Sequence, residues 1–587
     1  MAGEILRCLK GKESLLVEAG TGVGKSFAYL IPSALSREKT IVSTSSLALQ
    51  DQLVNKDLIF LQKALPQKFS FDILKGKNNY LCLKREREFS EASEAYTKFR
   101  EWLSETKTGE KDELSFLPGF WSKVCGDSQD CSGRMCPFYR NCFYYRHYWK
   151  LYKTDILVVN HHLLIYDLLS DFNILPFHKQ LIIDEAPDIE NVISHVLGSA
   201  LSYSKLTWLL YRLRGLKITV EHLFAEVESF FKKMDAPVQP VYPIPDPVIE
   251  KLRGFNRILA PDRIIATLEK YEKSVIDDKI KDRIETTISY VKTLAADIRD
   301  FIEQNDTDRV YYMTGNNGAL ELKSSLVESG KAFNFLKGKY DSVIMTSATL
   351  RSGGNFTFLR ERLGLEDFKE KVIGSPFDYK RQALLYIDSA LPLPGMANDE
   401  RFQKESLKVM EGLIDASRGR ALALFTSYRH LHFVSKNIRI DYPFKSQGDM
   451  PPARLIEWFK DTPDSVLLAT ATFWQGIDVR GEKLSLVVIV KLPFSSPGDP
   501  VYRERCRRLK NRWFHDLALP SAILTLRQGF GRLIRGQNEY GVVAILDRRL
   551  VSSSYGKTIV SSLPETNIVH NIEDVKKFFG HRNHLGC

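Results

Sequence analysis

The chain has 587 residues, which is long enough for several domains and excludes a single small module. Lys and Arg together number 83 against 72 Asp and Glu, so the formal net charge of +11 mildly favours a polyanionic partner. Hydrophobic residues make up 44% and charged residues 26%, and these ordinary globular values exclude a disordered or collagen-like chain.

No segment has the features of a membrane span or a secretory leader. The longest apolar stretch, residues 155–169, contains two histidines and internal aspartates, and charges such as Glu4, Arg7 and Lys10 are scattered through the first twenty residues. Eight cysteines are too few for a disulfide scaffold. We therefore expect a soluble, cytoplasmic protein without membrane association.

Short apolar runs, each followed by a turn and a helical pattern, occur in two sets along the chain. Such continuous runs are typical of strands buried on both faces, as in parallel sheets. They predict an α/β fold with two parallel sheets, whose strands include 15–17, 41–42, 156–159, 181–183 and 343–345 in the first set, and 421–425, 466–468, 486–490 and 542–546 in the second.

A glycine-rich loop follows the first apolar run and precedes a helical pattern. This order of strand, loop and helix is the context of a phosphate-binding loop, in which backbone N–H groups and a helix N-terminus face the phosphates. Lys25 is expected to contact the β and γ phosphates, and Ser26 to bind Mg²⁺. The alternative is an ordinary glycine turn. The loop residues are Ala19, Gly20, Thr21, Gly22, Val23, Gly24, Lys25 and Ser26, with Ala19 where the general pattern has glycine.

Two carboxylates, Asp184 and Glu185, stand at the carboxyl end of a predicted strand, where open α/β sheets bind ligands. Asp184 is predicted to hold Mg²⁺, and Glu185 to orient and deprotonate the attacking water. An Asp-Glu pair alone is commonplace, and the prediction depends on the phosphate loop upstream.

The segment 80–153 interrupts the first α/β domain and contains clustered cysteines. Cys131, Cys136 and Cys142 lie on one short stretch, and Cys82 lies on a distant arm. Four thiolates suit either zinc or an iron-sulfur cluster. Zinc sites usually show two-residue spacings, which are absent here. Cys125 is interpreted as a spare free thiol.

Aromatic and cationic residues alternate around the last of these cysteines, in residues 138–150. Aromatics interleaved with cations can stack bases and hold the phosphates of a single strand, which makes Tyr145 and Arg146 candidate nucleic-acid contacts. The alternative is that most of these rings pack around the metal or onto the first sheet.

A mostly helical insert is predicted between the two sheets, from Leu201 to Glu303. Apolar residues from Val220 to Met234 follow three-four spacing, so this stripe is expected to face a core. Prolines between Pro237 and Pro247 interrupt the pattern, and charged helical sequence resumes at about Val248.

Near the carboxyl terminus, Gln528 to Arg535 reads QGFGRLIR. A second α/β domain could bring Arg532 and Arg535 onto the exposed γ-phosphate, where guanidinium groups stabilise the transition state. Their i, i+3 spacing predicts that both lie on one face of a helix. The alternative is an exposed basic helix.

Three segments, 343–350, 475–481 and 528–535, resemble the ordered motifs of superfamily 2 helicases, and with the cysteines the whole chain resembles the XPD/DinG family of iron-sulfur DNA helicases. The resemblance implies two RecA-like motor domains, with an iron-sulfur insert and a helical arch in the first. The corresponding divisions are 1–79, 154–198 and 336–378 for motor domain 1, 80–153 for the cluster domain, 199–335 for the arch and 379–587 for motor domain 2.

The resemblance also implies site roles. The spacing and the NYLC context of Cys82 are similar to the DinG branch, which assigns a [4Fe-4S] cluster to Cys82, Cys131, Cys136 and Cys142. Hydroxyl-rich loops suit backbone contacts without base reading, and here they contain Ser43, Thr44 and Thr346. Gln528 and Asp478 are expected to position the nucleotide.

Two positions depart from the family pattern. Pro187 stands where a histidine is expected after Asp184-Glu185-Ala186, which predicts weaker coupling between ATP hydrolysis and DNA. Ala19 lies so near Met1 that no upstream adenine-reading segment is visible; either the true start is earlier or base selectivity is reduced.

The resulting hypothesis is a DNA helicase that uses ATP and Mg²⁺, moves 5′ to 3′ on single-stranded DNA and unwinds forked duplex. It is expected to act as a monomer in DNA repair or replication-associated processing. The first alternative is an ATP switch that clamps or remodels DNA without strand separation. The second alternative is an RNA motor, since no residue clearly senses a 2′-hydroxyl.

Overall fold

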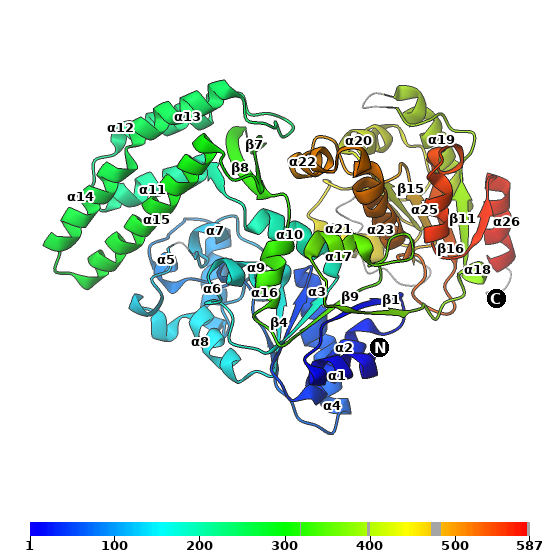
Figure 1. Ribbon diagram of the computed structural model, residues 1–587, viewed down its shortest axis with the longest axis horizontal. Helices are drawn as coiled ribbons and strands as arrows, with labels where there is room; N and C mark the ends of the chain where they lie inside the picture. Colours follow the sequence, from blue (N-terminus) through cyan, green and yellow to red (C-terminus); the bar gives the residue numbers. More distant parts are fainter. Residues whose placement is uncertain (129, 317, 396–398, 471–482, 584–587) are drawn as a thin grey trace.

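The protein contains two parallel seven-stranded sheets, each covered by helices on both faces (Figure 1). The computed structural model describes residues 1–128, 130–316, 318–395, 399–470 and 483–583. Predicted residue Asp478 and the whole segment 475–481 therefore lie outside the described residues. Every strand run predicted from the sequence forms a strand of one of these two sheets, so the predicted α/β fold is confirmed.

The first sheet has the strand order β10-β1-β9-β5-β2-β4-β3, and all of its pairings are parallel. The carboxyl ends of its strands therefore meet at one edge, where α/β sheets bind ligands. The strands are β1 (Leu15–Ala19), β2 (Thr40–Thr44), β3 (Phe71–Ile73), β4 (Ile156–Asn160), β5 (Gln180–Asp184), β9 (Ser342–Ser347) and β10 (Lys369–Ile373).

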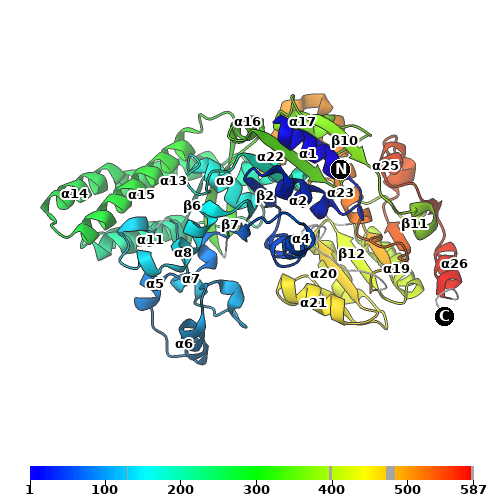
Figure 2. The ribbon, with the colours of Figure 1, turned by 90° about the horizontal axis from the view of Figure 1, so that it is seen from below.

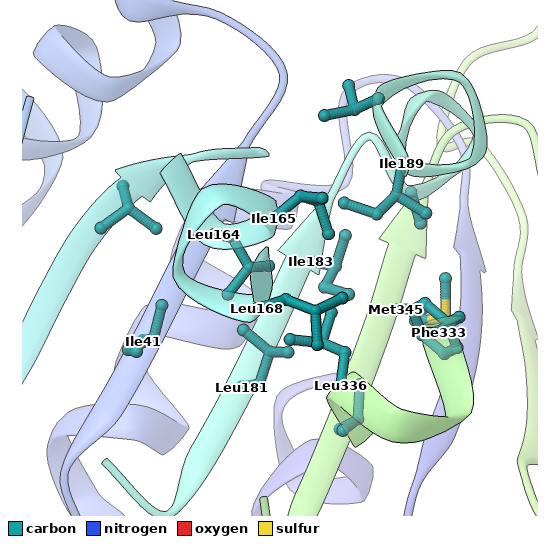
Figure 3. Close-up of a cluster of buried hydrophobic side chains, with 14 of the residues drawn as sticks. Ile41, Leu164, Ile165, Leu168, Leu181, Ile183, Ile189, Phe333, Leu336 and Met345 are labelled. Carbon is teal, nitrogen blue, oxygen red and sulfur yellow. The ribbon is translucent and has the colours of Figure 1, made fainter. Parts of the chain in front are cut away.

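Helices bury the two faces of this sheet separately. Helices α1 (Ala2–Gly11) and α2 (Lys25–Ser36) cover one face. On the other face, α9 (His161–Leu169), α10 (Ile189–Val196), α16 (Gly330–Lys337) and α17 (Thr357–Leu363) enclose the cluster that Figure 3 shows, in which Ile183 and Met345 of the strands meet Leu168 and Leu336 of the helices. Burial on both faces explains why these strands read as continuous apolar runs.

The second sheet has the order β13-β14-β12-β15-β16-β11-β17 and is also entirely parallel. The chain passes from β10 of the first sheet to β11 of the second through residues 374–382. The strands are β11 (Ala383–Ile387), β12 (Ala421–Phe425), β13 (Phe444–Ser446), β14 (Val466–Thr470), β15 (Leu486–Ile489), β16 (Gly541–Ile545) and β17 (Asn567–Val569).

The cysteine-bearing insert has a small core of its own, formed around Phe99, Phe120, Trp121 and Val124. Its main helices are α5 (Leu83–Arg87), α6 (Glu94–Glu105), α7 (Trp121–Val124) and α8 (Phe143–Lys150). In both ribbon views these helices lie beside the second insert, on the side away from the second sheet (Figure 2).

The second insert is mostly helical, as predicted. Its helices are α11 (Tyr203–Gly215), α12 (Glu221–Phe231), α13 (Asp246–Leu259), α14 (Pro261–Ser274) and α15 (Asp278–Glu303). The apolar stripe of α12 faces their shared core, and the proline-rich segment separates α12 from α13. A three-stranded antiparallel sheet at the base was not predicted; it contains β6 (Ala200–Ser202), β7 (Arg309–Asn316) and β8 (Ala319–Leu326).

The inserts contact each other and the second sheet's domain. Arg212 of α11 donates to Asp130 of the cysteine-bearing insert at 2.6 Å, and the Arg212 side chain is buried. On the opposite side, Tyr242 of the proline-rich segment donates to Glu504 of α22 (Pro500–Leu509) at 2.8 Å. Arg505 of the same helix is buried and reaches Glu190 of α10 at 2.7 Å.

Candidate functional site

The predicted phosphate loop has the expected local structure. Strand β1 ends at Ala19, and α2 begins at Lys25 with Gly24 as its N-cap. Gly22 and Gly24 adopt left-handed φ values of 84° and 72°, which favour glycine. A side chain at Gly22 would also collide with the Phe377 ring, whose nearest atom would lie 2.2 Å from the added carbon. The loop is therefore shaped by residues of the segment that joins the two sheets.

Glu185 lies within the reach of Lys25. The Lys25 ammonium is 3.3 Å from one carboxylate oxygen, and the Ser347 hydroxyl donates to the other at 2.8 Å. Burial by itself raises the pKa of Glu185, but Lys25, Ser347 and Arg532 outweigh it and lower the net pKa. Glu185 is therefore ionised at neutral pH, as a general base must be.

Asp184 has a different environment from that of its neighbour. Tyr29 of α2 donates to its Oδ2 at 2.9 Å, and the backbone N–H of Glu185 donates to its Oδ1 at 2.9 Å. Burial, followed by the charge of Glu185, raises the pKa of Asp184 to about 6. Tyr29 also interacts with the Ser26 hydroxyl, so one tyrosine connects the two side chains predicted to bind Mg²⁺.

The turn after Asp184 accommodates Pro187. Glu185 adopts a left-handed backbone, with φ 51° and ψ 49°, and Pro187 lies in the short 3-10 turn Ala186–Asp188 that leads into α10. Proline is tolerated in such a first turn because its missing N–H has no helical partner there. A left-handed non-glycine residue stores strain that its surroundings must hold.

The second sheet's domain approaches the loop through α23 (Leu519–Phe530) and the residues after it. A Cβ added to Gly531 would lie 3.2 Å from the Thr21 side chain, so this helix end abuts the phosphate loop. The Arg532 charge acts on Glu185 and lowers its pKa. Gln528 lies in the last turn of α23. The prediction that Arg532 and Arg535 share a helix face is wrong, because α23 ends at Phe530 and both arginines follow it.

A buried ion pair joins the two domains beside the phosphate loop. Arg527 of α23 reaches both carboxylate oxygens of Glu18, at 3.0 and 3.1 Å, and Arg351 also donates to Glu18 at 3.0 Å. Burial raises the pKa of Glu18, but Arg527 and the backbone N–H groups of residues 350 and 351 lower it overall. Sequence analysis missed these contacts, although a glutamate inside an apolar strand was a signal that a cation must meet it.

The side chains of Ser43, Thr44 and Thr346 are fully buried. Ser43 lies 2.7 Å from Nδ1 of His161, and the Thr44 hydroxyl donates to the carbonyl of Ser46. These three hydroxyls therefore lie inside the domain, and the expectation that they contact nucleic acid stays a prediction. Ser45 and Ser46 are only half-buried and lie nearer the surface.

The four predicted cluster ligands are neighbours, each half-buried. Burial raises the pKa of Cys82, and the nearby Cys131 and Cys136 raise it further; Cys142 is affected likewise by burial and by Cys131 and Cys82. Backbone N–H groups at the starts of α5 and α8 oppose these shifts at Cys82 and Cys142. Neighbouring cysteines, two of which face backbone N–H groups of their own, fit an iron-sulfur cluster, whose sulfurs accept such bonds.

Within the described ranges, no group of three or more His, Cys, Asp or Glu side chains is arranged to hold a single metal ion. Cys125 instead lies in the small apolar core of its insert.

The aromatic residues of α8 and of the short turns on either side of it divide into a packed set and an exposed set. Tyr145 is half-buried, its ring is 4.8 Å from that of Tyr139, and its hydroxyl is 3.8 Å from Sγ of Cys131. Arg146 is exposed. Trp149 and Tyr152 are 41% and 44% exposed and stack on each other at 5.3 Å, so they offer more free ring surface than Tyr145.

Two parallel sheets with a phosphate loop between them define the class of P-loop proteins with two RecA-like domains. Residues 410–566 match the family model of a helicase C-terminal domain. "ATP-dependent DNA helicase YoaA" of Haemophilus influenzae is 31% identical over 98% of this chain and 94% of that protein. "ATP-dependent helicase DinG" of Mycobacterium tuberculosis is 30% identical over 96% and 92%.

A solved structure titled "XPD_Helicase" shares the fold with a TM-score of 0.61 at 17% identity, covering 97% of this chain and 98% of that one. The chain belongs to the XPD/DinG-type family of superfamily 2 helicases. No helix among the described residues is long and apolar enough to cross a membrane.

Proposed function

We propose that this protein is an ATP-dependent DNA helicase. The observation that carries the proposal is the pairing of Lys25 with Glu185 in one domain, together with the charge of Arg532 from the other domain, which acts on the same Glu185. A triphosphate held there would draw the two domains together, and its hydrolysis would release them. Similarity to relatives named as ATP-dependent DNA helicases supports DNA as the track.

The chain's own residues divide the work of hydrolysis. The backbone of residues 19–26 and Lys25 would hold the phosphates, with Ser26 and Asp184 on Mg²⁺, which would neutralise phosphate charge. Glu185 would accept a proton from the attacking water, and Arg532 would stabilise the charge that develops on the γ-phosphoryl group. Gln528, Arg535 and Asp478 would contribute to nucleotide positioning.

We further propose 5′ to 3′ movement of a monomer on single-stranded DNA, in the cytoplasm, in repair or replication-associated processing. We propose the division of the chain expected from the sequence, with the cluster domain at 80–153 and the arch at 199–335. The ion pair between Arg212 and Asp130 supports this division, because it joins the arch to the cluster domain beside motor domain 1.

A forked duplex with one labelled strand tests the proposal. The protein with ATP and Mg²⁺ should separate a fork that has a 5′ overhang and leave one with only a 3′ overhang intact. Lys25→Ala should abolish separation, since the phosphates would lose their cation. A Lys25→Ala protein that unwinds as fast as the parent would refute the mechanism.

The second candidate function is a nucleic-acid-stimulated ATP switch that binds forks without separating them. Pro187 favours this function. It follows Asp184 and Glu185 in the turn Ala186–Asp188, and proline has no side-chain donor that could couple these carboxylates to a DNA-binding element. ATP hydrolysis that is stimulated by DNA, without separation of either fork, would decide for the switch. A Pro187→His variant that gains unwinding would then show that the absent side chain at position 187 is what uncouples hydrolysis from strand separation.

The cysteine site is expected to hold a [4Fe-4S] cluster on Cys82, Cys131, Cys136 and Cys142. Anaerobically purified protein should show a broad absorbance near ~400 nm from sulfur-to-iron charge transfer, with about four irons per chain. Cys142→Ser should abolish the absorbance, whereas Cys125→Ser should retain it because Cys125 lies in the apolar core. Stoichiometric zinc without this absorbance would contradict the assignment.

The exposed aromatic pair predicts a stacking site for single-stranded DNA. Trp149→Ala should weaken binding of a fluorescent oligonucleotide by about 1–3 kcal/mol, the usual contribution of one base stacked on an aromatic ring. Arg134, which lies 5.5 Å from the Trp149 ring, adds a cation there. Phe335→Ala on α16, a ring that is 62% exposed, is the matched control. Unchanged binding in Trp149→Ala, with a loss in Tyr145→Ala and Arg146→Ala, would instead favour the contacts expected from the sequence.

A further inference from the structure

His161 lies between the loop after β2 and the catalytic carboxylates. It is the first residue of α9 and is fully buried. Its Nδ1 is 2.7 Å from the Ser43 hydroxyl, and Ser43 pairs directly with Ile183 of β5, next to Asp184. No role in binding nucleotide, metal or nucleic acid has been assigned to this histidine, yet it lies between a loop expected to contact nucleic acid and the carboxylates expected to act on the nucleotide.

The state of the imidazole follows from its surroundings. Burial lowers the pKa of His161 to about 4, so the ring is neutral and carries a single N–H. Backbone groups of Glu185 and Asp184 face the ring and act to raise the pKa, as carbonyl oxygens near an N–H do. The arrangement fits an Nε2–H directed at these carbonyls, with Nδ1 accepting from the Ser43 hydroxyl.

The contact with the carboxylate turn is incomplete. Among the described residues, Nε2 has no partner in hydrogen-bond geometry, although it is buried. A buried donor without an acceptor is costly, and a small shift of the Glu185 carbonyl would satisfy it. Glu185 has the left-handed backbone of this turn, so such a shift would also move the carboxylate that faces Lys25.

Ser43 in turn is tied to a surface loop. It is followed by Thr44, whose hydroxyl donates to the Ser46 carbonyl, and by Ser46, whose side chain caps α3 (Leu47–Gln52). Ser45 and Ser46 are the half-buried residues of this loop. A displacement of the loop is therefore transmitted to the Ser43 hydroxyl through a rigid strand end rather than lost in a flexible segment.

We propose that His161 is a positioning residue that links the loop after β2, where a nucleic-acid strand would bind, to the orientation of Glu185. This inference rests on the proposed function, since it requires a nucleic acid at the loop and hydrolysis at Glu185. It also provides a link at the place where Pro187 offers no side-chain donor. Binding at the loop would shift Ser43, turn the imidazole and bring Nε2–H into contact with the Glu185 carbonyl.

Two substitutions test the two ring nitrogens of His161 separately. His161→Asn keeps a polar atom near the Nδ1 position and loses the reach to Glu185, whereas His161→Gln places an amide near the Nε2 position. The ratio of ATPase kcat with and without a poly-dT oligonucleotide is the readout. We expect His161→Asn to lower this ratio by about 10- to 100-fold, the size typical of lost supporting contacts, with partial rescue in His161→Gln.

In both His161 variants, the KM for ATP and the affinity for the oligonucleotide should stay within about 2-fold of the parent values, a small change in binding free energy. The reason is that His161 is not expected to touch either ligand. His162→Gln, the exposed neighbour, should retain the parent ratio. Ser43→Ala should lower the ratio as well, and the double variant Ser43→Ala with His161→Asn should lose no more than the larger single loss, since both act in one chain of contacts.

Thermal melting distinguishes positioning from folding. The inference is overturned if both His161 variants keep the parent ratio, or if both lose basal and stimulated ATPase equally along with melting temperature. A parent protein that shows no oligonucleotide stimulation would overturn the proposed function itself, and the link with it. If the oligonucleotide stimulates the parent and His161→Asn to the same degree, the proposed role of His161 is overturned while the proposed function stands.

Discussion

Replacing Arg532 with alanine is expected to lower kcat for DNA-stimulated ATP hydrolysis by about 10³- to 10⁵-fold, the range measured for arginine fingers. Arg532 follows α23 of the second domain, and its charge already lowers the pKa of Glu185 in the first domain. A guanidinium in that place would meet the charge that spreads over the γ-phosphoryl oxygens in the transition state.

A single-turnover measurement of phosphate release checks this prediction. ATP affinity should fall far less than kcat, because the contact strengthens mainly in the transition state. Arg401→Ala, an exposed arginine of α19 (Glu400–Ala416) in the same domain, is the control and should behave as the parent. If Arg535→Ala were severe and Arg532→Ala mild, the assignment of the finger would have to be exchanged.

Glu185→Gln is expected to reduce hydrolysis by about 10²- to 10⁴-fold while nucleotide binding survives. The amide keeps the shape of the side chain but accepts no proton from water. It also removes the negative partner that holds Lys25 at 3.3 Å, which leaves the ammonium free for phosphate. We therefore expect equal or tighter binding of ATP in the variant.

Equilibrium titration with a fluorescent ATP analogue, together with steady-state phosphate release, separates the two effects. Glu361→Gln on the exposed face of α17 provides the matched control. A Glu185→Gln variant with weakened ATP binding and unchanged kcat would show that the carboxylate serves binding, and that another group activates water.

The elements that sequence analysis predicted are those with a local signal. Strand β1, the loop and α2 appear in the sequence as an apolar run, glycines at positions with positive φ, and a helical pattern, and all three are adjacent in the chain. The antiparallel pair β7 and β8 carries mixed polar and apolar residues on a half-exposed sheet, so its runs gave no comparable signal.

The missed parts of the site depend on contacts between distant residues. Arg527 meets Glu18 across 509 positions, and Ser347 meets Glu185 across 162 positions, and no local spacing encodes either contact. The i, i+3 interpretation of Arg532 and Arg535 failed because it assumed a continuing helix, whereas α23 ends two residues before Arg532. Ser43 was predicted to contact nucleic acid because of its hydroxyl, whereas the structure buries that hydroxyl 2.7 Å from Nδ1 of His161, a contact that no local spacing encodes.

The helix α22 gives the helical insert a second point of attachment. Tyr242 of the insert donates to Glu504 of α22. The neighbouring Arg505 of α22 pairs with Glu190 of α10, in the domain of the first sheet. An appendage fixed at one end follows only the domain from which it grows. A segment attached to both domains must change its contacts whenever the domains move relative to each other. If ATP binding and hydrolysis move the domains as proposed, the Tyr242–Glu504 contact would transmit that movement to the helical insert and, through Arg212 and Asp130, to the cysteine-bearing insert.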